Sequence, residues 1–93
     1  MHSDVVHEAS GHRFRVEMNG GNALLNYMRD GGTIVFTHTE VPPAMEGKGI
    51  GGELARAGLE YAREHGLRVV ARCPFVASYL QRHPEYEGLV QAE

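Results

Sequence analysis

Four glycines within six residues constrain this 93-residue chain more than any other feature. They lie in the run Glu46 to Gly52, which reads Glu-Gly-Lys-Gly-Ile-Gly-Gly, between an extended segment ending near Val41 and a helical pattern that continues to His65. Amides in the first turn of a helix have no intrahelical partner, and glycines leave them open to a ligand. The sequence therefore predicts an anion site, and a cofactor phosphate is the expected anion.

Two common glycine motifs do not explain this run. Gly47 to Gly52 matches the G-x-G-x-x-G spacing of dinucleotide-binding folds, but residues 67–73 lack the acidic residue expected about 20 positions later. A P-loop requires Ser or Thr after its lysine, whereas Gly49 follows Lys48. A third motif must therefore be considered together with the rest of the chain.

Length and composition predict one domain spanning residues 1–93. A formal charge of -3 and the lack of a Lys/Arg run argue against a nucleic-acid partner. No apolar run approaches the ~18 residues of a membrane span, and residues 1–4 lack signal-peptide features. With a single cysteine, an internal disulfide is excluded, and a cytoplasmic location is expected. The six histidines lack metal-motif spacings, so no metal is expected.

The first forty residues predict antiparallel strands. Phe14, Val16 and Met18 alternate with charged residues, the period of a strand with one buried face. Glycine-rich turns at residues 19–21 and 30–32 separate this strand from the next two. The predicted strands are a short edge strand at 5–8, then 13–18, 23–28 and 33–39.

The second half predicts a helix, a strand and a shorter helix. Gly66 is expected to end the first helix, and residues 67–72 to return as a strand parallel to 33–39 in a right-handed crossover. Pro74 should open the second helix and Pro84 should end it. In the tail, Tyr86, Leu89 and Val90 are expected to dock. The apolar stripe predicted to face the sheet contains Ile50, Leu54, Ala57, Tyr61 and Ala62.

The third glycine motif is the pyrophosphate loop of GCN5-related (GNAT) N-acetyltransferases: Gln or Arg, two residues, Gly, one residue, then Gly or Ala. Gly49 and Gly51 fill its glycine positions, while Glu46 departs from the usual Gln or Arg. With residues 38–42 and the block from 73 to 86, the chain resembles the minimal one-domain branch of that superfamily. The resemblance covers residues 5–90.

The resemblance implies a truncated GNAT-like fold of the α+β class, with three or four antiparallel strands, a crossover helix, a parallel strand and a short C-terminal helix. Elements that build the acceptor pocket in larger relatives are expected to be missing, so a protein partner or an oligomer would complete it. The resemblance also implies that backbone groups hold the pantetheine and pyrophosphate of acetyl-CoA. The residues implied are Val41, Gly47, Lys48, Gly49, Ile50, Gly51 and Gly52.

Two candidate catalytic residues lie at the second helix. Cys73 stands at its N-terminus beside Arg72, a setting that favours a reactive thiolate, although a lone cysteine is also commonly a small buried hydrophobe. The resemblance implies that Cys73 lies close to the acetyl thioester as a potential acetyl acceptor. Tyr79 resembles the superfamily tyrosine that protonates the departing CoA thiolate, and core packing is its alternative role.

His38 and Glu40 share a face of the strand expected to flank the cofactor, because side chains alternate along a strand. Histidine can serve as general base for an amine at neutral pH. The alternative is a hydrogen-bonded histidine that stabilises the strand end. Either role places these residues near the cofactor.

The leading function from the sequence is acetyl transfer from acetyl-CoA to a small-molecule or protein amine. One alternative is a non-catalytic acyl-CoA-binding module that keeps the glycine loop without turnover. Another is an interaction domain whose open sheet edge recruits a further strand.

Overall fold

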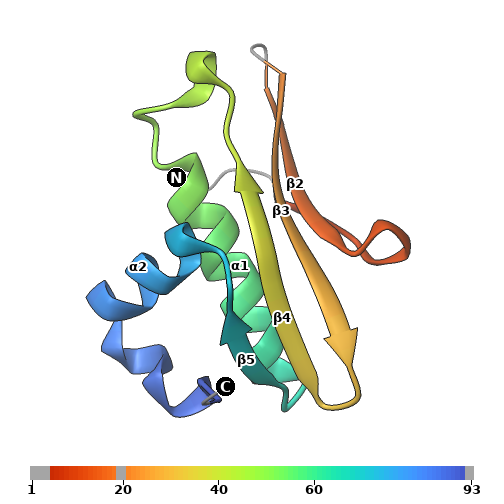
Figure 1. Cartoon of the computed structure of the whole chain (residues 1–93). Coiled ribbons are helices and arrows are strands. Elements are labelled where there is room, and N and C mark those ends of the chain that lie inside the picture. The colour runs from red at the N-terminus through yellow and green to blue at the C-terminus, as the bar shows by residue number, and fades with distance from the viewer. Residues whose placement is uncertain (1–4, 19–20, 92–93) are drawn as a thin grey trace.

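The computed structural model describes residues 5–18 and 21–91 (Figure 1). Strands occupy the first part of the chain, and helices alternate with a last strand in the second. Short 3-10 turns cover Ala9–Gly11, Pro43–Met45 and Pro84–Leu89. The main elements are β1 (Val6–Glu8), β2 (Arg13–Met18), β3 (Gly21–Asp30), β4 (Thr33–Glu40), α1 (Ile50–Glu64), β5 (Arg68–Ala71) and α2 (Pro74–Arg82).

The strands form one mixed sheet in the order β1-β2-β3-β4-β5. Pairing is antiparallel from β1 to β4 and parallel between β4 and β5, so the expected α+β class and crossover are confirmed. The turn at residues 30–32 is present, with Gly31 at φ 59°. Residues 19 and 20 of the other predicted turn lie outside the described residues, and Met18 pairs with Gly21 on either side of them.

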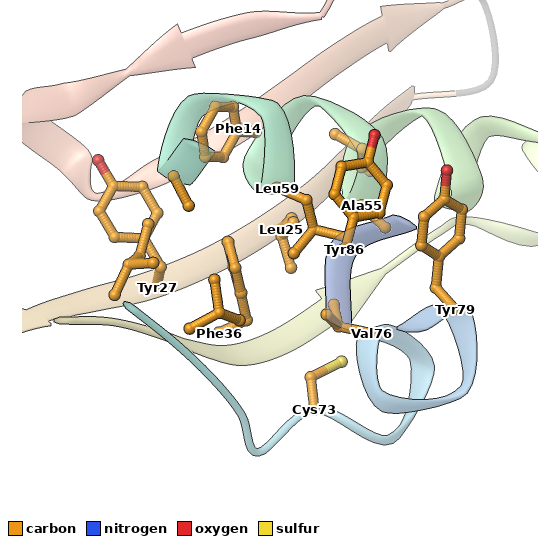
Figure 2. Close-up of a cluster of buried hydrophobic side chains, with 14 of the residues drawn as sticks. Phe14, Leu25, Tyr27, Phe36, Ala55, Leu59, Cys73, Val76, Tyr79 and Tyr86 are labelled. Carbon is orange, nitrogen blue, oxygen red and sulfur yellow. The ribbon is translucent and has the colours of Figure 1, made fainter. Parts of the chain in front are cut away.

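Helix α1 lies along one face of the sheet, where the buried side chains form a single cluster (Figures 1 and 2). The buried face of α1 is rotated about the helix axis relative to the predicted stripe. Ala57 and Tyr61 are only partly buried, whereas Gly58 and Leu59 are buried. The reason is a close approach at Gly58, where an added Cβ would lie 2.7 Å from a ring carbon of Phe36. The glycine allows the helix to rest directly on the sheet.

β4 runs past its parallel neighbour. Its pairing with β5 ends where Phe36 meets Ala71, but its pairing with β3 continues to Glu40. A bulge interrupts the β3–β4 register, because Tyr27 pairs with Phe36 while Asn26 pairs with His38. One extra residue in a strand reverses which face the following side chains point to.

The C-terminal tail packs against the core through the 3-10 turn Pro84–Leu89, which the sequence did not predict. Tyr86 docks as expected. Tyr86 is buried, and its hydroxyl donates to Glu60 on α1 over 2.6 Å. Burial is the main cause that raises the pKa of Tyr86 to about 12, and the hydrogen bond to Glu60 adds to it. Val90 forms an isolated parallel bridge with Val69, which lies on the outer strand. Within residues 5–18 and 21–91, no helix is long and apolar enough to cross a membrane.

Two glycines of α1 provide a matched test of the close approach. We expect Gly58→Ala to lower the free energy of unfolding by about 1 kcal/mol. Overpacking against Phe36 should destabilise by ~1–3 kcal/mol, and the higher helix propensity of Ala should offset about 1 kcal/mol of this. At Gly52 an added Cβ would stand 3.7 Å from Tyr79, an ordinary contact, so Gly52→Ala should stabilise. Urea denaturation measures both, and equal effects of the two variants would contradict this packing argument.

The side chain of His7 packs the edge strand β1 against the core. Its ring stacks on Phe14 with centroids 4.3 Å apart, meets Tyr61 edge-on, and its Nε2 lies 2.6 Å from the Tyr27 hydroxyl. Burial, with a smaller contribution from the charge of His65, lowers the pKa of His7 below its usual 6.5. Folding therefore disfavours the protonated ring.

The pH dependence follows from that direction. The unfolded chain binds the His7 proton more tightly, so the contribution of His7 to stability is complete above pH 6.5 and is lost as the pH falls through the lowered folded value. We expect His7→Phe to reduce the loss of unfolding free energy between about pH 7 and pH 5. Denaturant melts across this range measure it, and an unchanged slope would show that His7 carries none of the dependence.

Candidate functional site

A pocket of about 450 Å³ opens where the end of β4, the glycine loop and the starts of both long helices meet. It lies at the same end of the sheet as the gap between β4 and β5. Its lining combines the glycine backbone of the loop, apolar side chains and one threonine hydroxyl group. The lining residues are Thr39, Val41, Met45, Glu46, Gly47, Gly49, Ile50, Gly51, Gly52 and Phe75.

The glycine loop presents unbonded amides to this pocket. Gly49 is the N-cap of α1 at φ 75°, and the first hydrogen bond of the helix runs from the Glu53 amide to its carbonyl over 3.1 Å. The amides of residues 50–52 therefore precede the intrahelical ladder. An added Cβ at Gly49 would meet nothing within 4 Å, so the space beside it is open. The backbone here suits an anion, and the exposed Lys48 adds a positive charge.

Gly51 serves a different purpose from Gly49. An added Cβ there would lie 2.7 Å from the ring of Phe75, which belongs to the first turn of α2 and remains 36% exposed. The absence of a side chain lets Phe75 lie across the first turn of α1 and form one wall of the pocket. Sequence reasoning missed Phe75, and Met45, because a wall residue carries no motif of its own.

Thr39 and Cys73 meet where β4 borders the pocket. The Thr39 Oγ1 lies 2.9 Å from the Cys73 Sγ, and Cys73 is only 3% exposed. Cys73 is the N-cap of α2, and its own amide donates to the Phe36 carbonyl over 3.0 Å. Thr39 lines the pocket and Cys73 lies behind it. Thr39 was missed because the bulge that turns it to this face leaves no local signal.

His38 and Glu40 lie on the opposite face of β4. Thr39 pairs with the buried Leu25, whereas His38 pairs with Asn26, and alternate residues point to opposite faces. As expected, the two share a face, with 3.9 Å between the His38 Nε2 and the Glu40 carboxylate. Their side chains are 62% and 63% exposed. The structure brings neither of them to the Cys73 sulfur.

Tyr79 is not directed at the thiol either. Its side chain lies against α1, pointing away from the Cys73 sulfur (Figure 2). The ring stacks on His83 with centroids 3.8 Å apart and is buried to 7% exposure. Burial raises the pKa of Tyr79, which keeps the phenol protonated. In this conformation Tyr79 packs in the core, the alternative role that the sequence left open.

A second pocket, of about 490 Å³, lies along the outer edge of β5 between α2 and the tail. It is slightly larger, but its lining is mostly apolar, with residues such as Val70, Leu80 and Val90. Its lining residues include neither the start of an α-helix nor a basic side chain. The glycine-loop pocket is therefore the site whose chemistry fits an anionic cofactor. Among the described residues, no three His, Cys, Asp or Glu side chains gather to hold a metal ion.

Comparison with known proteins decides the family. The model of GCN5-related N-acetyltransferases matches residues 13–89, which include the whole site. The chain belongs to that family. Protein NATD1 from human and from chicken is 36% identical over 83 residues, or 86% of this chain and 74% and 76% of theirs. The solution structure of a GCN5-like protein from Staphylococcus aureus superposes with a TM-score of 0.72 at 28% identity, covering 88% of this chain and 83% of that one.

The family fold is thus the predicted GNAT-like one, reduced to five strands with a single parallel pair. The pocket identified from geometry coincides with the loop that the resemblance assigned to the cofactor. Val41, Gly47, Gly49, Ile50, Gly51 and Gly52 all line it, and Lys48 lies within the same loop.

Alanine substitutions at two glycines with positive φ can distinguish an effect on cofactor binding from an effect on stability. Gly49 and Gly66 have φ of 75° and 66°, and neither would place a Cβ within 4 Å of another atom. Alanine at either position should cost roughly 1–2 kcal/mol of stability through backbone strain. Only Gly49→Ala also places a methyl group in the pocket, so we expect it alone to weaken CoA binding. Calorimetry with CoA tests this, and equal affinities for the two variants would remove the loop from the site.

Proposed function

We propose that this protein transfers an acetyl group from acetyl-CoA to an amine. The observation that carries the proposal is the set of chemical groups that meet at the pocket. Loop amides and Lys48 suit a pyrophosphate, Met45 and Ile50 are apolar and suit a pantetheine arm, and the Thr39 hydroxyl lies 2.9 Å from the thiol of Cys73 behind it. Acetyl-CoA has matching parts, from charged phosphates to reactive thioester.

The gap between the strands supports this reading. β4 continues past Phe36 without a parallel neighbour, so the backbone edge of residues 37–40 on that side is free for an extended ligand. An amide-containing arm can satisfy such backbone groups in the way that a sixth strand would. Acetyl-CoA would then lie between β4 and β5 with its thioester near Cys73.

The acetyl group can reach the amine by two chemical routes. In the covalent route, the Cys73 sulfur attacks the thioester carbonyl, the bond from the carbonyl to the CoA sulfur breaks, and the proton of Cys73 ends on CoA. The amine then takes the acetyl group from Cys73, and the thiol is restored. In the direct route, His38 or Glu40 removes a proton from the amine, whose nitrogen attacks the thioester carbonyl itself; the bond from the carbonyl to the CoA sulfur breaks, and CoA takes up a proton and leaves as the thiol.

The routes predict opposite mutant behaviour. In the covalent route, wild type incubated with acetyl-CoA gains one acetyl group that hydroxylamine removes, and Cys73→Ser gains none while binding CoA normally. Cys73 is the single cysteine, so a thioester adduct can only be on it, and its loss in Cys73→Ser distinguishes it from acetyl groups on histidine or tyrosine. In the direct route, Cys73→Ser keeps most activity and His38→Ala loses roughly 100-fold or more. Intact-protein mass spectrometry and an amine acetylation assay distinguish the two.

A non-catalytic acyl-CoA-binding module is the second candidate, and Glu46 favours it. Its carboxylate lines the pocket at the position where the family motif has Gln or Arg, so it brings negative charge near the phosphates. This candidate predicts CoA binding with neither an acetyl adduct nor amine acetylation. Glu46→Gln should then tighten CoA binding by removing the repulsion, without creating activity.

A further inference from the structure

The contact between Thr39 and Cys73 closes the gap between β4 and β5 at the level where the strands separate. Thr39 comes from β4 and Cys73 from the start of α2, and their side-chain atoms are 2.9 Å apart, too close to admit a methylene group between them. Of the two, Thr39 faces the pocket. The pair therefore forms an end wall for anything that enters from the glycine loop.

The core behind this wall is closely packed. Phe36 and Val76 are fully buried, and the Cys73 side chain lies beside Val76 (Figure 2). The Phe36 carbonyl accepts hydrogen bonds from the amides of Arg72 and Cys73, each over 3.0 Å, so the backbone behind the wall is fixed as well. A close-packed interior yields little to an added methylene group. A group that passed between the pair would meet these buried side chains.

We infer that Thr39, braced by Cys73, sets the length of the acyl group and restricts the site to acetyl. This inference rests on the proposed binding of acyl-CoA at the pocket. An acetyl group ends at the wall, whereas a longer chain must push Thr39 against the sulfur. Discrimination of one methylene by a fitted apolar site is typically tenfold or more.

The bulge at Thr37 supplies a matched control. Thr37 and Thr39 are the same residue type on the same strand, but the Thr37 hydroxyl lies 3.3 Å from the Asn26 carbonyl and is not part of the pocket lining. Thr39→Ala should enlarge the end of the site, while Thr37→Ala should leave it unchanged. Both remove the same atoms from β4.

The experiment is calorimetric titration of wild type, Thr39→Ala and Thr37→Ala with CoA, acetyl-CoA, propionyl-CoA and butyryl-CoA. Because transfer to Cys73 would consume the thioester, the series is repeated with each protein in a Cys73→Ser background. We expect wild type and Thr37→Ala to bind propionyl-CoA and butyryl-CoA about tenfold more weakly than acetyl-CoA. Thr39→Ala should bind all three acyl-CoAs within about twofold of one another.

Failure of this inference can be told apart from failure of the proposed function. If CoA itself does not bind, the site assignment is wrong. If CoA and every acyl-CoA bind wild type equally, the cofactor site stands and the end wall does not limit the acyl group. If wild type discriminates and Thr39→Ala discriminates equally, another residue sets the limit and the role of Thr39 is overturned.

Discussion

The carbonyl of Phe36 accepts the amides of both Arg72 and Cys73, and the remainder of the site depends on this arrangement. It ends the parallel pairing, because one carbonyl receives the amides of the two residues that follow β5. The chain then turns into α2 with Cys73 as its N-cap, while β4 continues toward Glu40 alongside β3 only. A gap between the two strands and a thiol at its edge are therefore consequences of a single terminating interaction.

The glycines show how one residue type meets different physical demands within a single helix. Gly49 permits the left-handed backbone that begins α1 and leaves its amides open, while Gly51 and Gly58 are small so that Phe75 and Phe36 can approach. The first demand is local, so the spacing of the motif revealed it. The other two depend on aromatic rings far away in the sequence, and for this reason the predicted buried stripe of α1 was turned from the observed one.

The same division explains what could be predicted elsewhere. Alternation in β2, the glycine turn before β4 and the prolines around α2 act over a few residues, and the elements that they specify are present. The bulge at Thr37 arises from the pairing of β4 with β3, since the two strands must realign between residues 36 and 38. Strand alternation alone was enough to predict that His38 and Glu40, both beyond the bulge, share one face. It could not reveal that Thr39 turns toward the pocket and reaches Cys73.

The arrangement also relates the two chemical routes to one another. An amine that approaches from the face carrying His38 and Glu40 is separated from the pocket by the contact of Thr39 with Cys73. In the direct route that contact must open before transfer, so that the amine can reach the thioester. In the covalent route the contact must also open, because Cys73 lies behind Thr39 and its sulfur can reach the thioester only then. The acetylated sulfur must afterwards stay accessible to the amine, although Cys73 is buried in the closed arrangement. Both routes thus require the same pair of side chains to separate before the bond to CoA is broken, and they differ in which group, the Cys73 sulfur or the amine, then attacks the thioester.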